Sequence, residues 1–271
     1  MASPLLILFS TSVIAGFLAT LLLVVAVSVD NWEHTSYDLH LLRSVNASCR
    51  TQAHIECQVT QISDDPLMIR FDEFGNNNSR NYSSLLLSTH GGLWRVCHDL
   101  TDKLISEHIS AGGSNYNGQR CYTYVTDYDE ESEQLTKETK QIARLQNSAA
   151  SCFIVVLMDL CSAAVVGILG LIHKQVASCM IAGVLYLTAG RFFKSLFGVF
   201  GLSMFHTKDY YEKYKCYAID EIPSKVCSSR TVTVGYAVPL AWAGIVMCIL
   251  ACFIWLFVSK VLRVLRAKTM L

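Results

Sequence analysis

The chain has 271 residues, of which 52% are hydrophobic and 16% are charged. Soluble domains carry about 25% charged residues, so this composition argues against an ordinary soluble protein. The formal net charge is zero, which gives no reason to expect a nucleic-acid partner, and four prolines without low-complexity runs argue against a disordered scaffold.

Four apolar segments, at residues 5–29, 149–172, 176–205 and 232–258, are separated by polar ones. Each is long enough to cross a bilayer, which takes roughly 20 apolar residues. The first has no basic residues before it and a long apolar stretch, so we predict a spanning helix and not a signal peptide. The sequence therefore predicts four transmembrane helices.

Basic residues beside the spans predict the orientation. The tail at residues 259–271 carries Lys260, Arg263, Arg266 and Lys268, which places it in the cytoplasm. Four crossings then put both termini inside and residues 30–147 and 206–230 outside. The first outer segment has 17 acidic and 10 basic residues, a net charge of −7, which supports the same topology. We expect a multi-pass protein of the plasma membrane.

Two charged residues fall inside predicted spans at similar depths from the cytoplasmic side. Asp159 lies in the second span and Arg191 in the third. A lone charge near the bilayer centre costs on the order of 3 kcal/mol, so an ion pair between these helices would lower the cost. The alternative is that the basic side chain reaches the interface or faces a partner protein.

Glycosylation and cysteine signals agree with this topology. Acceptor sequons begin at Asn46, Asn77 and Asn81, all in the first outer segment. Six of the 11 cysteines lie in the outer segments, which favours disulfides. Proximity along the chain favours Cys49–Cys57 and Cys216–Cys227, although six cysteines allow other pairings. The five cysteines inside spans are interpreted as small apolar packing residues.

The first outer segment is long enough to fold as a layer of its own. Residues 85–100 and 120–125 are rich in β-branched and aromatic residues and predict paired strands, with a turn signal at 115–118 between them. The acidic stretch 127–140 predicts a solvated helix or linker that leads back to the membrane.

The residues that follow the first span resemble a known family signature. The pattern comprises Trp32, Gly92, Leu93, Trp94, Cys97, Cys121 and Arg144. It resembles the claudin superfamily, which includes claudins, peripheral myelin and epithelial membrane proteins and the calcium-channel gamma subunits. The resemblance implies an all-α membrane four-helix bundle with a small extracellular antiparallel β-sheet, and a Cys97–Cys121 disulfide.

The chain also departs from tight-junction claudins. Between Cys97 and Cys121 lie 23 residues, more than claudins have, and the insertion with Cys49, Cys57 and the sequons is foreign to them. The match is closer to divergent, claudin-domain-containing proteins. Because fold does not carry function with it, barrier function does not transfer.

Two functions are compatible with this resemblance. One is adhesion or junction organisation at cell contacts, through itself or other claudin-like proteins. The alternative is an auxiliary subunit that alters the trafficking or gating of a channel or receptor. We find no catalytic motif and scattered histidines only, so we expect no enzyme activity, no metal site and no cofactor.

The C-terminal residues Thr269, Met270 and Leu271 resemble a ligand of PDZ domains. Such a peptide adds a strand to a sheet edge while backbone amides hold its carboxylate. The tail before it alternates apolar and basic residues, as an interfacial helix does, which would hold the terminus near the membrane.

Overall fold

The computed structural model describes residues 4–50, 55–64, 67–75, 82–100, 120–124, 137–173, 177–178, 180–182, 197–217 and 224–269. The chain divides into two compact units. The helical unit comprises residues 1–29, 148–205 and 236–271, and the sheet unit comprises residues 30–147 and 206–235. Both segments that were predicted to lie outside the membrane therefore fall in the sheet unit.

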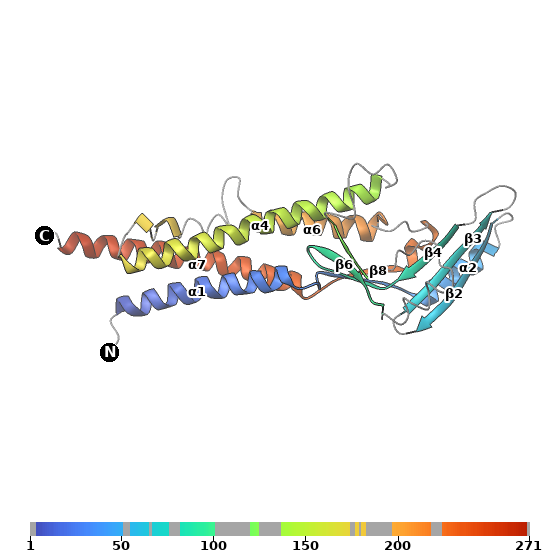
Figure 1. Ribbon diagram of the computed structural model, residues 1–271, viewed down its shortest axis with the longest axis horizontal. Coiled ribbons are helices and arrows are strands. Elements are labelled where there is room, and N and C mark those ends of the chain that lie inside the picture. The colour runs from blue at the N-terminus through green and yellow to red at the C-terminus, as the bar shows by residue number, and fades with distance from the viewer. Residues whose placement is uncertain are drawn as a thin grey trace. The chain divides into compact units, whose positions relative to one another are not determined.

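Long helices dominate the fold (Figure 1): α1 (Pro4–Ser28), α4 (Lys137–Ile172), α6 (Phe197–Tyr214) and α7 (Ala237–Thr269). Among the described residues, the stretches Ile7–Ser28, Lys137–Gly170 and Ala237–Leu265 are long and apolar enough to cross a membrane. The span expected at 176–205 falls largely on residues 183–196, outside the described residues. The fourth crossing therefore stays a prediction.

Small residues bring the helices of the helical unit close together. Helix α7 packs along α1, and at Gly244 a side chain would collide with the Leu23 side chain, whose Cγ lies 2.6 Å from the position of an added Cβ. Gly167 of α4 likewise faces the ring of Trp255, 2.9 Å from such a position. Small residues at helix contacts are typical of membrane bundles, where close packing drives association.

The sheet unit contains a five-stranded antiparallel sheet, sheet A, in the order β7-β6-β5-β1-β8. Its strands are β1 (Glu33–Tyr37), β5 (Thr89–Gly91), β6 (Arg95–His98), β7 (Cys121–Thr123) and β8 (Arg230–Val234). Strand β8 comes from the second polar segment and pairs with β1 along its whole length, from Glu33 opposite Val234 to Tyr37 opposite Arg230. One sheet therefore joins both polar segments.

A second, three-stranded sheet, sheet B, has the order β2-β3-β4. It consists of β2 (Ile55–Asp64), β3 (Leu67–Gly75) and β4 (Tyr82–Leu87), and helix α2 (Leu39–Arg50) packs beside it (Figure 1). The 3₁₀ helix η1 (Ser224–Ser229) contacts α2. A small core of Tyr37, Leu42, Ile69, Leu86 and Val226 unites these elements.

Some of the described strands and helices were predicted from the sequence and others were not. Strands β4 to β7 lie where the stretches 85–100 and 120–125 predicted strands. The sequence analysis did not anticipate α2, sheet B, β1 or β8. Helix α7 begins at Ala237, after residue 232, because residues 230–234 pair with β1. Helix α4 begins at Lys137, before the expected span 149–172, and helix α6 ends at Tyr214, after the expected span 176–205.

Candidate functional site

Part of the signature lies beside the start of β1 and the end of β5 in sheet A: Trp32, Gly92 and Leu93. Trp32 is fully buried, its backbone N–H donates to the Gly91 carbonyl at 2.7 Å, and its own carbonyl accepts from Gly235 at 2.8 Å. A side chain at Gly92 would meet the Cα of Asp30 at 2.9 Å, so the close approach of the two backbones requires glycine there. Leu93 is fully buried as well.

Two residues outside the signature fix this turn. The buried Gln146 side chain donates to the carbonyls of Gly92 and Leu93 at 3.0 and 2.9 Å. Arg95 pairs with Asp30 through two nitrogens at 2.6 and 2.5 Å, and this hydrogen bond with the carboxylate charge raises the pKa of the guanidinium. The sequence analysis missed these residues, because their partners are far away along the chain.

Two disulfides brace the sheet unit. Cys97 and Cys121 are bonded, and they stand directly opposite each other on β6 and β7 with Cα atoms 4.1 Å apart. Cys216 and Cys227 are bonded too, and join the end of α6 to η1. Cys216 has a positive φ of 56°, a conformation that non-glycine residues adopt infrequently. The side chains of Cys49 and Cys57 lie outside the described residues, so their pairing stays a prediction.

A buried ionic cluster lies between sheet A and helix α6, and consists of Glu33, Tyr124, Lys208 and Glu212. The Lys208 ammonium is fully buried, donates a hydrogen bond to the Glu33 carboxylate and lies 3.6 Å from that of Glu212. The Tyr124 hydroxyl donates to Glu33 at 3.3 Å, and the Lys208 nitrogen lies 5.4 Å from the centre of its ring. The cluster joins β1 and the end of β7 to helix α6, and so ties the first polar segment to the second.

The charged groups of this cluster shift one another's pKa values, and the charge of Arg230 acts on Lys208 and Glu212 as well. Burial raises the pKa of Glu212 to about 7, and the neighbouring Glu33 carboxylate adds to the effect. Burial by itself would lower the pKa of Lys208, but the two carboxylates outweigh it and leave that pKa raised. The second oxygens of Glu33 and Glu212 have no hydrogen-bond partner among the described residues. The buried Glu212 carboxylate therefore depends on Lys208, and to a smaller extent on Arg230, for compensation of its charge.

Two members of the cluster, Lys208 and Glu212, carried a weak signal in the sequence. Lys208 and Glu212 are four residues apart, the spacing of an ion pair on one helix face. They follow the third apolar segment directly, which indicates that the helix continues past residue 205. Nothing in the sequence connects this pair to Glu33, because the contact spans 175 positions.

Two histidines and an aspartate form a separate group on sheet A. His34 and His90 are opposite each other on β1 and β5. Asp99 accepts from His90 Nδ1 at 2.5 Å and lies 3.5 Å from His34 Nε2. Each side chain is 30–47% exposed. Among the described residues, no three His, Cys, Asp or Glu side chains are arranged to hold a metal ion.

The structure places the remaining expected site residues apart from one another. Arg144 is exposed on α4, and Asp159 is half-buried on the same helix. The expected partner Arg191, the sequons at Asn77 and Asn81 and the terminal Met270 and Leu271 lie outside the described residues, as do the side chains of Asn46 and Thr269. The intramembrane pair, the glycans and the PDZ ligand therefore stay predictions.

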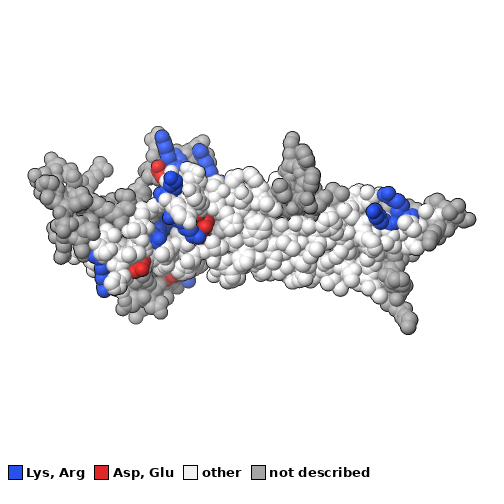
Figure 2. Space-filling view, turned by 180° about the vertical axis from the view of Figure 1, so that it is seen from behind, with Lys and Arg blue, Asp and Glu red and all other residues white. Residues whose placement is uncertain are grey.

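Charged side chains are distributed unevenly over the surface. On the face seen in Figure 2, lysine, arginine and acidic residues gather on the sheet unit, whereas the helical unit is uncharged apart from one basic patch. Apolar residues instead dominate the exposed side chains of the helical unit, including Phe17, Met158 and Phe253. An apolar exterior on helices of spanning length is what a lipid environment requires.

Comparison with known proteins agrees with this geometry. Residues 17–257 match the family described as PMP-22/EMP/MP20/Claudin tight junction. The match covers most of the chain, including both sheets, the candidate membrane helix Lys137–Gly170 and parts of the other two candidate membrane helices. No curated protein matches the chain.

Proposed function

Because the chain belongs to the PMP-22/EMP/MP20/claudin family, we propose that it is a non-enzymatic membrane protein that acts in cell–cell contact, by adhesion or by junction organisation. It would cross the plasma membrane four times with both termini in the cytoplasm, and it would present the sheet unit to the outside. Its partners would be copies of itself or other claudin-like proteins on the same or the facing cell.

The observation that carries this proposal is the bracing of the sheet unit. Strand β8 adds to β1, so sheet A is built from both polar segments. The Cys97–Cys121 disulfide braces the first segment and the Cys216–Cys227 disulfide braces the second, whereas the Lys208–Glu33 ion pair joins the two. A rigid exterior loses little conformational entropy on association, which suits a surface that binds other proteins repeatedly.

Mixed cell cultures test the proposal. Cells that express the chain with a red tag are mixed with cells that express it with a green tag, and with cells that lack it. We expect enrichment where red and green cells touch and none where an expressing cell touches a non-expressing cell. Equal intensity at all contacts, with normal surface expression, would contradict a homophilic adhesive role.

The alternative is an auxiliary subunit of a channel or receptor, and sheet B favours it. This sheet belongs to the insertion that tight-junction claudins lack, and its outermost strand β2 is ten residues long and pairs only with β3 among the described strands. A strand with one free edge can accept a strand from a partner. The sequons in the same insertion point the same way, because bulky glycans obstruct tight packing between like chains.

The same cultures distinguish the two functions. A channel or receptor subunit that copurifies with the chain from the surface, without enrichment at contacts between expressing cells, would support the auxiliary role. Cells that express the Asn77→Gln and Asn81→Gln variants serve as a comparison, because the loss of glycans from the insertion should strengthen contact enrichment if like chains associate.

A further inference from the structure

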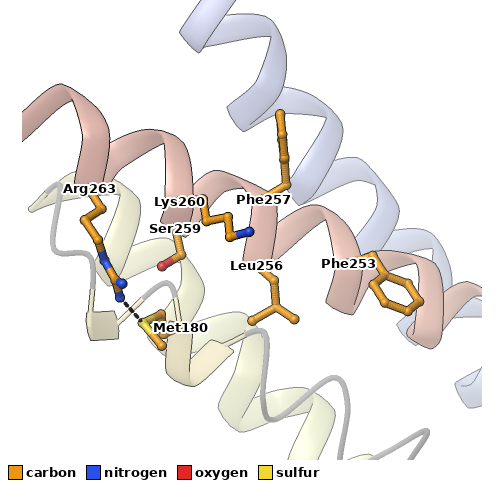
Figure 3. Close-up of a pocket in the computed structure, with 7 residues that line it drawn as sticks. All are labelled: Met180, Phe253, Leu256, Phe257, Ser259, Lys260 and Arg263. Atoms are coloured by element: carbon orange, nitrogen blue, oxygen red, sulfur yellow. Dashed lines mark hydrogen bonds between the residues drawn. The ribbon is translucent and has the colours of Figure 1, made fainter.

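A groove opens along the second half of α7 in the helical unit (Figure 3). Its cavity measures about 410 Å³, and its walls are largely apolar. Met180 lies on one side, and Phe253, Leu256 and Phe257 line the other. Phe253 and Phe257 are more than half exposed, so large apolar surface is available at the groove.

One end of the groove is polar and basic. Ser259, Lys260 and Arg263 lie there on successive turns of α7. Lys260 and Arg263 are exposed and form the basic patch of the helical unit. In Figure 3 the Arg263 guanidinium points at Met180, and its nitrogen lies 3.3 Å from the thioether sulfur. A thioether is a weak acceptor that cannot balance the charge of a guanidinium.

The sequence offers these cations little compensation within their unit. Asp159 is the one acidic residue in the stretches that make up the helical unit, and none of the ion pairs among the described residues involves Lys260 or Arg263. The groove therefore joins an apolar wall to a basic end, which is complementary to a molecule with an acyl chain and an anionic head.

The position of the basic end along the span matches that of lipid headgroups. The apolar part of α7 ends at Leu265, so Lys260 and Arg263 lie within its last two turns. Phe253 lies ten residues before Arg263, roughly 15 Å along the helix axis at about 1.5 Å per residue. A phosphate held at Arg263 would thus leave its acyl chain beside the phenylalanines.

We propose that this groove binds an anionic phospholipid. Lys260 and Arg263 would hold the phosphate, the Ser259 hydroxyl would donate to it, and one acyl chain would lie against Phe253, Leu256 and Phe257. Basic pockets between membrane helices on the cytoplasmic side are a recognised way to bind such headgroups, and the anionic lipids of a plasma membrane are concentrated in that leaflet. The inference is independent of whether the sheet unit acts in adhesion or on a channel.

Lipid binding to the purified full chain tests the proposal. The chain in neutral detergent is titrated with phosphatidylserine, and separately with phosphatidylcholine of the same acyl chains, and bound lipid is counted by native mass spectrometry. We expect phosphatidylserine to bind at lower concentration. Lys260→Gln and Arg263→Gln should each weaken phosphatidylserine binding about fivefold, because a basic residue near an anionic lipid surface contributes about 1 kcal/mol. The double variant should weaken it about 25-fold.

Two further variants separate a site from general attraction. The double variant Arg266→Gln with Lys268→Gln also removes two positive charges from the tail, but outside the groove, and should change phosphatidylserine binding less than threefold. Leu256→Trp narrows the groove without changing any charge and should weaken both lipids. Equal losses in the two double variants, or unchanged binding in Leu256→Trp, would overturn the proposal. Inorganic phosphate should not compete at millimolar concentration, and competition would point to free phosphate as the ligand.

Misfolding is checked separately from binding. Each variant is heated in phosphatidylcholine-containing detergent, and its unfolding midpoint is compared with that of the unchanged chain. A variant with an unaltered midpoint and lost phosphatidylserine binding supports the site. If Arg263→Gln binds phosphatidylserine as the unchanged chain does while its midpoint is unaltered, then the basic end of the groove does not hold the headgroup.

Discussion

The two units of this protein place polar and apolar side chains in opposite ways. In the sheet unit the most buried large side chains include a lysine, Lys208, at 0% exposure, with Glu33 and Glu212 at 6% and 5%. In the helical unit Phe17, Met158 and Ile172 are 66–69% exposed. Each arrangement would be costly in the other's surroundings, because a buried charge needs partners and an exposed apolar side chain needs lipid.

This contrast shows that stability has different sources in the two units. The helical unit has no apolar driving force between its helices once lipid surrounds it, so close contact at glycines and alanines must supply the stability. The sheet unit has modest cores. It depends on disulfides, on strand pairing between distant segments and on a buried ionic cluster. Substitutions should therefore destabilise the two units for different reasons.

The largest effect is expected when the buried cluster loses its cation. Lys208→Met keeps the length of the side chain but removes the cation that contacts both buried carboxylates, and leaves Arg230 as the remaining cation that acts on Glu212. Removing one partner of a buried pair costs about 3–5 kcal/mol, so the variant should be retained in the secretory pathway. Surface staining of the tagged chain measures this.

Lys213→Met is the matched control for that substitution. Lys213 lies five residues further along α6 and pairs with Asp209 at 2.9 Å, with its side chain 31% exposed. A surface pair of this kind contributes about 0–1 kcal/mol, so surface staining should be nearly unchanged. Equal loss of staining in both variants would show that the buried cluster has no special role.

Loss of the β6–β7 disulfide should come next. Cys97→Ser removes a bridge in a small sheet unit, and the loss of such a bridge typically costs about 2–5 kcal/mol. We expect retention in the secretory pathway and a lower unfolding midpoint for any protein that escapes. Cys216→Ser offers a comparison, because its disulfide closes a shorter loop and should cost less. A larger loss in Cys216→Ser would place the main constraint at η1 and not in sheet A.

In the helical unit, a bulky side chain should be costly at a close helix contact and tolerated on the exposed face. Gly244→Leu pushes a side chain into Leu23 on α1 and should destabilise the helix pair by about 1–3 kcal/mol. Ala243→Leu places the same side chain one position earlier, where it is exposed, and should be close to neutral. Unfolding midpoints of the two variants in detergent provide the measurement, and equal midpoints would show that α1 and α7 do not pack at Gly244.

The smallest effect concerns pH and arises from Glu212. Its pKa is about 7 in the folded chain against 4.5 for an ordinary glutamate, so the folded state binds a proton more tightly than the unfolded state does. Stability from this group is therefore present below about pH 4.5 and is lost as pH rises towards 7. The unfolding midpoint of the chain should be higher at pH 5.5 than at pH 8.

Glu212→Gln isolates this contribution. The variant carries a neutral side chain at every pH, so the part of the pH dependence that belongs to Glu212 should disappear. An unchanged pH profile in Glu212→Gln would show that this carboxyl is already ionised across the range and that Lys208 fully compensates it.

The sequence by itself determined the membrane character, the family and some of the local elements of the chain. Runs of about 20 apolar residues predict spanning helices, because a backbone that crosses lipid must satisfy its hydrogen bonds internally. The pattern of Trp32, Gly92 to Trp94 and the two cysteines gave the family, which the match over residues 17–257 confirms. Strands β4 to β7 also followed from local composition, since β-branched and aromatic residues favour a pleated surface.

Only the tertiary structure decided how the two polar segments combine. The pairing of β1 with β8 and the contact of Lys208 with Glu33 join residues that are about 175–200 positions apart, and no local pattern encodes such a contact. The same holds for α2 and sheet B, whose small core forms only when Leu42, Ile69 and Val226 meet. Local preference follows from the residues themselves, whereas register and partner choice follow from burial, which depends on the whole chain at once.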